Sequence, residues 1–161
     1  MKLYKKIILA VITTFAVSNV AMAAEFTVNG TAYMLGTTDN TTTPDGSTMG
    51  NYTNQGILTV EGMPEGFPSE VFGTCNGVNL TSSAWTNLGD AFICTMVDAD
   101  GDGYINVGTT TAHDWSNCSF NRVAAWGKWA GTTEAGACWF AGSVTADHFI
   151  LKFTSTFTTP E

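Results

Sequence analysis

The chain has 161 residues, of which 44% are hydrophobic and only 12% are charged, and its formal net charge is −8. A chain of this length normally forms one domain with a hydrophobic core, and its few charges argue against a disordered, highly charged chain. The acidic balance argues against nucleic-acid binding, because phosphate contacts require lysine and arginine. The 17 glycines, many threonines and 12% aromatic residues are typical of β structure with many turns.

The N-terminal segment, residues 1–23, predicts a secretory signal peptide. Three lysines lie among the first six residues, an apolar stretch runs from residue 7 to about 17, and Ala21-Met22-Ala23 supplies a small-residue cleavage site. The alternative is a membrane anchor, but polar residues interrupt the apolar stretch, which stays short of the roughly 20 residues that a spanning helix needs. We therefore expect cleavage after Ala23, a mature domain of residues 24–161, and a periplasmic or extracellular location.

Removal of the signal peptide changes the charge balance. The mature chain keeps all of the Asp and Glu residues but only three basic ones, Arg122, Lys128 and Lys152, which gives a net charge of −11. Such an anionic surface disfavours nucleic acid and anionic membrane surfaces, and it leaves cations, neutral ligands and basic proteins as candidate partners. No later stretch is long and apolar enough to predict a membrane-spanning segment.

All four cysteines, Cys75, Cys94, Cys118 and Cys138, lie after the predicted cleavage site. An even number of cysteines in an exported chain predicts two disulfides, for which three connectivities are open. We favour Cys75–Cys94 and Cys118–Cys138, because each pair would join strands separated by one excursion of the chain. The alternative is a four-thiolate zinc site, but no C-x-x-C spacing or adjacent histidine supports it.

Alternating apolar and polar residues predict strands along the mature chain. In the clearest one, from Phe149 to Phe157, the odd-numbered residues would share one face and the even-numbered residues the other. The stretch from Thr37 to Asn54 predicts a loop, because it is mostly Thr, Gly, Asn and Asp. The other predicted strands lie near residues 26–28, 33–35, 57–60, 71–75, 78–80, 91–97, 104–111, 118–126 and 137–145.

The spacing of these strands, with no sustained apolar period near 3.6, predicts a single all-β domain, either a barrel or a sandwich. We favour an eight-stranded antiparallel β-barrel, because closure hides the edge strands of a protein rich in β formers.

The turn from Asp98 to Gly103 is the most acidic segment. Asp98, Asp100 and Asp102 stand at positions one, three and five of a calcium loop, with Gly103 at position six. Position twelve is Thr109 instead of glutamate, and the flanks predict strands instead of helices. A plain hairpin turn, in which Asp and Gly supply the positive-φ positions, is therefore favoured, and a weak calcium site is the alternative. We expect no other cofactor.

The run Cys94-Thr-Met-Val-Asp-Ala-Asp-Gly-Asp-Gly103 is followed further along the chain by Gly127-Lys-Trp-Ala-Gly-Thr-Thr-Glu-Ala-Gly136. Together these motifs resemble bacterial secreted proteins related to the allene oxide cyclase barrel, over roughly residues 70–158. The resemblance implies an eight-stranded antiparallel barrel with an apolar cavity, similar to lipocalin-like and dirigent folds, and it implies homo-oligomers. It carries over no catalytic residue, because the plant enzyme's catalytic positions do not map onto this chain.

Four of the five tryptophans fall between Trp115 and Trp139, with Arg122 among them. They predict either side chains that fill the barrel or an aromatic wall for a ligand, with Arg122 as an orienting cation. The candidate ligand-binding residues are Trp115, Arg122, Trp126, Trp139 and Phe153.

Three functions remain open. The leading hypothesis is an exported β-barrel that binds a hydrophobic or aromatic small molecule without chemistry of its own. The alternatives are an isomerase or cyclase of the allene oxide cyclase type, with unassigned catalytic residues, and a structural or oligomeric surface module. An apolar cavity would favour binding, convergent ionisable groups in the cavity would favour the enzyme, and a barrel filled by tryptophans would favour the module.

Overall fold

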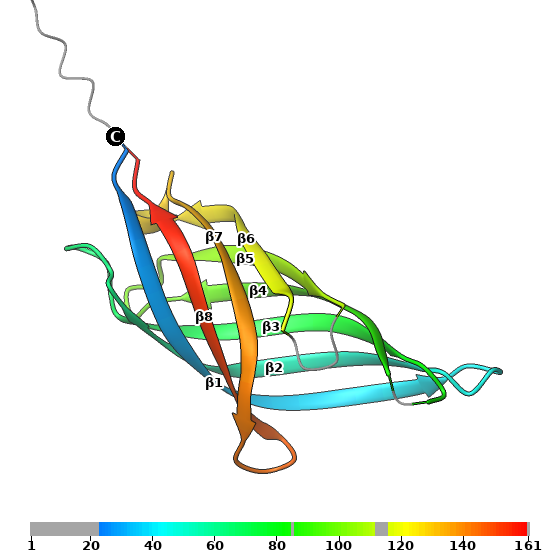
Figure 1. The fold of residues 1–161 in the computed structure, drawn as a ribbon. Coiled ribbons are helices and arrows are strands. Elements are labelled where there is room, and N and C mark those ends of the chain that lie inside the picture. The colour runs from blue at the N-terminus through cyan, green and yellow to red at the C-terminus, as the bar shows by residue number, and fades with distance from the viewer. Residues whose placement is uncertain (1–22, 85, 112–115, 161) are drawn as a thin grey trace, which may run out of the picture.

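The described part of the chain forms one closed β-barrel. A computed structural model describes residues 23–84, 86–111 and 116–160, in which each strand pairs antiparallel with the next and β8 pairs with β1 (Figure 1). The strands are β1 (Glu25–Thr42), β2 (Thr48–Glu61), β3 (Glu70–Thr81), β4 (Asn87–Val97), β5 (Gly103–Thr110), β6 (Cys118–Trp126), β7 (Thr133–Ser143) and β8 (His148–Thr158). The predicted all-β fold, an eight-stranded antiparallel barrel in a single domain, is confirmed.

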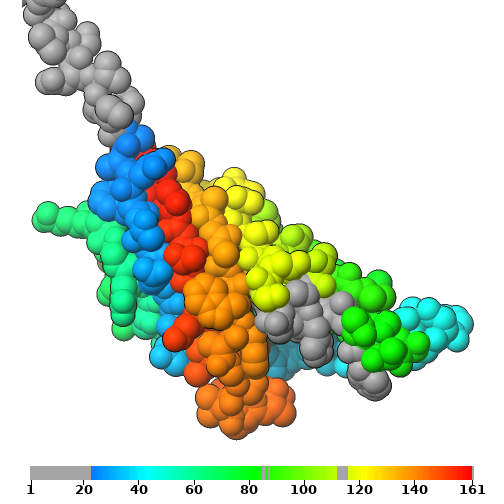
Figure 2. All heavy atoms as spheres, in the orientation of Figure 1, coloured from blue at the N-terminus to red at the C-terminus, as the bar shows by residue number. Residues whose placement is uncertain are grey.

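The closing seam of the barrel lies between β1 and β8. Eleven residue pairs join these two strands, from Glu25 opposite Thr158 to Leu35 opposite His148. The space-filling view shows β1, β8 and β7 in continuous contact across this face (Figure 2). Closure pairs β1 with β8 as far as Leu35, so this part of β1 presents no free edge to another chain.

Alternation along β8 separates the barrel interior from the outer face. Phe153, Ser155 and Phe157 are buried, whereas Lys152 and Thr156 are exposed. This burial pattern confirms the two faces predicted for the last strand, because successive side chains of a strand point to opposite sides of the sheet.

The loop predicted from Thr37 to Asn54 is wrong. β1 continues to Thr42 and β2 begins at Thr48, so that residues 43–47 alone form the turn. The two strands pair in unbroken register here, from Thr37 opposite Thr53 to Thr42 opposite Thr48. Threonine is a good strand former, and polar residues on the outer face of a barrel carry no penalty, so a polar composition did not indicate a loop. Two pairs of predicted short runs also merge, into β1 and β3.

The barrel end where β1 begins and β8 ends is closed by an aromatic cluster. A short 3-10 helix, η1 (Gly127–Trp129), places Trp129 inside the barrel with only 2% of its surface exposed. The ring centroid of Trp129 lies 4.8 Å from that of Tyr104, 5.0 Å from that of Phe67 and 6.1 Å from that of Phe157. The tilted and edge-on arrangements are those that aromatic pairs prefer.

The cysteines pair as predicted. Cys75 on β3 stands opposite Cys94 on β4, and Cys118 on β6 stands opposite Cys138 on β7. Their Cα atoms lie 4.0 Å and 5.0 Å apart, and each pair forms a disulfide in the structure. Both disulfides therefore join neighbouring strands of the barrel.

The predicted signal peptide lies, apart from Ala23, outside the described residues and stays a prediction. Among the residues that the structure covers, no helix has the length and apolar character needed to cross a membrane.

Candidate functional site

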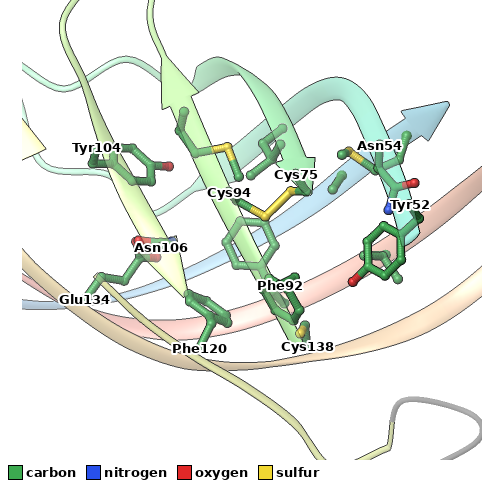
Figure 3. Close-up of a pocket in the computed structure, with 16 residues that line it drawn as sticks. Tyr52, Asn54, Cys75, Phe92, Cys94, Tyr104, Asn106, Phe120, Glu134 and Cys138 are labelled. Carbon is green, nitrogen blue, oxygen red and sulfur yellow. A yellow bond between two sulfur atoms is a disulfide. The ribbon is translucent and has the colours of Figure 1, made fainter. Parts of the chain in front are cut away.

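The barrel interior contains a cavity with a volume of about 80 Å³. Its walls are mainly apolar and include the rings of Phe92, Phe120 and Phe153. Figure 3 shows Asn106 and Glu134 on one side of this cavity and Tyr52 and Asn54 on the other, with Phe92 and the Cys75–Cys94 disulfide between them. The cavity is thus an apolar space with polar groups at two opposite ends.

Glycines on neighbouring strands make room for the large rings of the interior. A Cβ atom at Gly30 would overlap the ring of Phe153, and one at Gly77 would overlap the ring of Tyr52. A ring from one strand therefore occupies the space that a side chain on the adjacent strand would need. This small-against-large packing determines where the interior is filled and where the cavity remains.

Arg122 and Glu134 form a buried ion pair next to the cavity. The Nη2 atom of Arg122 donates to Oε2 of Glu134 at 2.6 Å, and the two side chains are only 2% and 6% exposed. Arg122 Nη1 donates to Thr132 Oγ1 at 2.6 Å, and Ser155 Oγ donates to the other carboxylate oxygen of Glu134, also at 2.6 Å. Hydrogen bonds from both sides therefore fix the carboxylate in place.

The guanidinium of Arg122 also stacks on aromatic rings. Its central carbon lies 3.8 Å from the ring centroid of Tyr104, 5.2 Å from that of Phe157 and 5.3 Å from that of Trp129. These distances are within the range of cation–π attraction. The aromatic cluster that closes the barrel end therefore also surrounds the buried cation.

Burial determines the electrostatics of this group. It lowers the pKa of Arg122, although the neighbouring Glu134 carboxylate opposes that change. Burial also raises the pKa of Tyr104, and Glu134 acts in the same direction, so the Tyr104 hydroxyl stays protonated. Because arginine remains charged in proteins, the opposite charges of Arg122 and Glu134 cancel, and the group has no net charge.

A second polar pair lies at the opposite end of the cavity. The hydroxyl of Tyr52 donates to Asp90 Oδ1 at 2.6 Å, and both residues are buried. Burial raises the pKa of Tyr52 and also that of Asp90, although the hydrogen bond from Tyr52 opposes the change in Asp90. This pair joins β2 to β4 across the interior.

The structure brings together only part of the predicted ligand-binding set. Arg122 and Phe153 face the interior, and Phe153 lines the cavity. Trp126 and Trp139 are 37% and 39% exposed and do not line it. Trp139 follows the inward-facing Cys138 and therefore points outward, and Trp126 donates its indole N–H to the carbonyl oxygen of Gly101 at 2.9 Å. Trp115 lies outside the described residues.

Among the cavity residues that the sequence did not predict, Asn106 and Glu134 form the polar group next to Arg122. Asn106 follows Tyr104 by two residues on β5, so the period-2 pattern puts both on the inner face, which could have indicated its position. Glu134 is contained in the second sequence motif, but nothing in that motif shows that it meets Arg122 across the β6–β7 hairpin.

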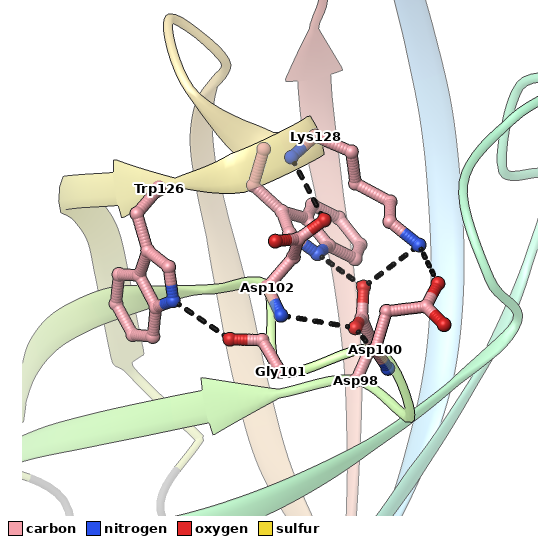
Figure 4. A network of polar contacts seen from close by, with 7 residues as sticks. Asp98, Asp100, Gly101, Asp102, Trp126 and Lys128 are labelled. Carbon is pink, nitrogen blue, oxygen red and sulfur yellow. Dashed lines mark hydrogen bonds and ion pairs between the residues drawn. The ribbon is translucent and has the colours of Figure 1, made fainter.

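The acidic turn binds the segment that closes the barrel end. Asp98 Oδ1 accepts from the backbone N–H groups of Asp100 and Asp102 at 2.9 Å and 3.2 Å. Its Oδ2 accepts from the indole N–H of Trp129 at 3.0 Å and lies 3.3 Å from Lys128 Nζ. Figure 4 shows Lys128 reaching across to Asp98 and Asp100. Asp98 therefore fixes both its own turn and η1.

The three aspartates do not converge on one point. Lys128 Nζ lies 2.6 Å from Asp100 Oδ2, and Asp102 Oδ2 accepts from the backbone N–H of Lys128 at 3.1 Å. Within the described ranges, no group of three His, Cys, Asp or Glu residues is arranged to hold a metal ion. Donors of η1 and of the turn thus already occupy at least one carboxylate oxygen of each aspartate.

We expect calcium to have little effect on the protein, because it would have to displace the Lys128 ammonium from Asp98 and Asp100. Isothermal titration of the purified protein with calcium should show no saturable heat at millimolar concentration. Calcium uptake that disappears in Asp100→Ala would contradict this expectation and establish the weak calcium site.

Asp98 is expected to give the protein an acid-sensitive contribution to stability. Burial alone would raise its pKa, but hydrogen bonds from Trp129 and from the turn, together with Lys128, lower the pKa below its ordinary value of 3.8. A carboxylate with a lowered pKa stabilises the fold at pH values above its pKa in the unfolded chain. This contribution is lost as the pH falls through its pKa in the folded protein.

The measurement is urea unfolding of the wild type and of Asp98→Asn between pH 7 and pH 2. At pH 7 the free energy of unfolding of Asp98→Asn should be about 2 kcal/mol lower than that of the wild type, as expected for hydrogen bonds to a buried charged group. This difference in free energy of unfolding should become smaller as the pH drops below about 4. A difference that stays constant over this range would show that ionised Asp98 does not hold the turn.

No known protein family matches the chain, and no curated protein or solved structure is significantly similar to it. The fold and the site define a small closed β-barrel with a mainly apolar interior cavity and a neutralised ion pair beside it.

Proposed function

We propose that this protein is an exported β-barrel that binds a compact, mainly apolar small molecule in its interior. The observation that carries the proposal is the interior cavity with aromatic and aliphatic walls and a few polar groups at its ends, which is the usual composition of small-molecule sites. The two disulfides support export, because disulfides persist in oxidising compartments. The relationship to allene oxide cyclase-like barrels stays a prediction.

The size of the cavity restricts the ligand. Its volume of about 80 Å³ is below the several hundred cubic ångströms of a typical ligand pocket. It is also smaller than an engineered cavity of about 150 Å³ that takes up benzene. Met34 and Met96 on the walls are adaptable side chains, so modest enlargement is possible. Compounds with only a few non-hydrogen atoms therefore fit better than fatty acids or isoprenoids.

Binding fits the cavity better than catalysis does. Glu134 is the carboxylate that lines the cavity, and both of its oxygens accept short hydrogen bonds, from Arg122 and Ser155. To act as a base it would have to give up a buried ion pair, which is costly. The isomerase or cyclase alternative would need a free ionisable group facing the substrate, so the proposal assigns no reaction to this site.

The test is a set of thermal-melting and methyl NMR titrations of the purified protein with short alcohols, short alkanes, fatty acids and isoprenoids. We expect the compact compounds to raise the melting temperature and to shift the methyl signals of Met34 and Met96. The variant Ala32→Leu, which fills the cavity wall, should abolish both effects. Ala137→Leu is the matched control, because it makes the same change on the exposed face of β7. If none of the compounds binds, ligand binding is refuted.

Homo-oligomerisation, which the resemblance implies, is favoured by one observation. Outward-facing apolar residues form a row across the neighbouring strands β8, β1, β2 and β3. Along this row Ile150 pairs with Tyr33, Tyr33 with Ile57, and Ile57 with Phe72. Tyr33, Ile57 and Phe72 are each at least half exposed. Light scattering should show a mass above that of one chain, and Ile57→Lys should reduce it to that of a monomer. A monomeric wild type would exclude this second function.

A further inference from the structure

The side-chain amide of Asn106 has one end without a partner. Asn106 is only 7% exposed and lines the cavity. Its Nδ2 donates to Glu134 Oε2 at 3.4 Å, whereas its Oδ1 has no hydrogen-bond partner within the described part of the chain. If the amide were turned around, Asn106 Oδ1 would face Glu134 Oε2, and both are acceptors. The Nδ2 end therefore faces Glu134, and Oδ1 is the end that can accept from another donor.

Glu134 keeps this amide in place. The carboxylate receives Arg122 on one oxygen and Ser155 on the other, and it can neither rotate nor leave without breaking these bonds. Asn106 is therefore held against a fixed acceptor, and its own oxygen remains a buried, unsatisfied acceptor on a residue that lines the cavity. Such a group costs stability until a water molecule or a ligand supplies the missing hydrogen bond.

The charges around Asn106 exclude a charged ligand. The negative charge of Glu134 is neutralised by Arg122 at 2.6 Å, and the Tyr104 hydroxyl stays protonated. An ion inside this cavity would lose its hydration without gaining a counter-ion, which is strongly unfavourable. A neutral donor, such as a hydroxyl group, avoids this cost.

We propose that the ligand of the barrel is a neutral, compact alcohol or phenol-like compound whose hydroxyl group donates to Oδ1 of Asn106. Its apolar part then lies against the rings of Phe92, Phe120 and Phe153. This inference rests on the proposed function, because it names the chemistry of the molecule that the same cavity binds.

The test uses isobutanol and isopentane, which have the same shape and the same number of non-hydrogen atoms but differ by one hydroxyl group. Both are titrated into the purified protein, with the methyl signals of Met34 and Met96 as the readout for Kd. The same titrations are made with Asn106→Leu and with Asn54→Leu, which makes the same replacement at the other end of the cavity. Isobutyrate is the charged compound of similar shape.

The ratio of the two Kd values, isobutanol over isopentane, should rise in Asn106→Leu by about three- to tenfold, as expected for one lost hydrogen bond. In Asn54→Leu the ratio should stay at the wild-type value, and isobutyrate should not bind to any of the three proteins.

An equal change in both variants, or no change in Asn106→Leu, would overturn the inference and leave the proposed function standing. Binding of isobutyrate as tight as that of isobutanol would also overturn it. If neither isobutanol nor isopentane shifts the methyl signals of the wild type, both the inference and the proposed function fail. Should Asn106→Leu not fold, the wild type still decides: nuclear Overhauser contacts must place bound isobutanol beside the Asn106 amide and not beside the Asn54 amide.

Discussion

Replacing Glu134 with leucine is expected to lower the free energy of unfolding by about 3–5 kcal/mol, the usual cost of removing one partner from a buried ion pair. The cost is large because Arg122 would stay charged inside the barrel, where its side chain is only 2% exposed. Arg122→Met should cost a similar amount, because it leaves the Glu134 carboxylate uncompensated. Urea unfolding of both variants at pH 7 measures these losses.

The double variant Arg122→Met/Glu134→Leu separates the uncompensated charge from the loss of packing. It should be destabilised less than either single variant, since no buried charge is left alone. Some loss should remain, because the hydroxyls of Thr132 and Ser155 each lose a partner.

Asp100→Asn provides the exposed counterpart. It breaks an ion pair with Lys128 that is also 2.6 Å long, but the Asp100 side chain is 74% exposed. Asp100→Asn should therefore change the free energy of unfolding by no more than about 0.5 kcal/mol. Equal losses for Asp100→Asn and Glu134→Leu would mean that solvent reaches the Arg122–Glu134 pair, and the neutral, desolvated interior proposed above would then be wrong.

The sequence predicts the strands best where one face is strictly apolar. In β8 the alternation of phenylalanines with polar residues indicates both the strand and its inward face, and the structure confirms them. Where the outer face of a strand carries Thr, Asn and Asp, as in β1 beyond Thr37, composition alone predicts a loop. Only the pairing with β2 shows that this segment is extended.

The candidate site is less predictable, because its contacts join distant parts of the chain. Asp98 was identified from its turn, but its partners Lys128 and Trp129 lie on η1, after both β5 and β6. Arg122 was identified as an orienting cation for a ligand, but the sequence does not show which of the acidic residues pairs with it. For the tryptophans, the sequence does not show which face of the strand they lie on, because a large aromatic side chain fits either face of a barrel strand. Local alternation around Cys138, and not residue type, puts Trp139 on the outside.

Removal of the Cys118–Cys138 disulfide is expected to open the barrel locally, whereas removal of Cys75–Cys94 is not. The two disulfides have sequence separations of 20 and 19, so the chain-entropy model gives the same global loss for each, about 3 kcal/mol. The difference lies in the strands that they join. Only four residue pairs connect β6 to β7, from Cys118 opposite Cys138 to Asn121 opposite Ala135, whereas ten connect β3 to β4.

The two paired alanine variants, Cys118→Ala/Cys138→Ala and Cys75→Ala/Cys94→Ala, are compared by native-state hydrogen exchange and by urea unfolding. In the first variant the amides of β6 and β7 should exchange through an opening that costs less free energy than global unfolding, because a four-pair ladder remains as the connection. In the second variant the amides of β3 and β4 should exchange only by global unfolding, since ten pairs hold those strands together without the disulfide. If the amides of β6 and β7 stay as protected as those of β3 and β4, the short β6–β7 ladder is not the least stable strand pairing of the barrel. Another contact between these strands, such as the Arg122–Glu134 ion pair, must then hold them together.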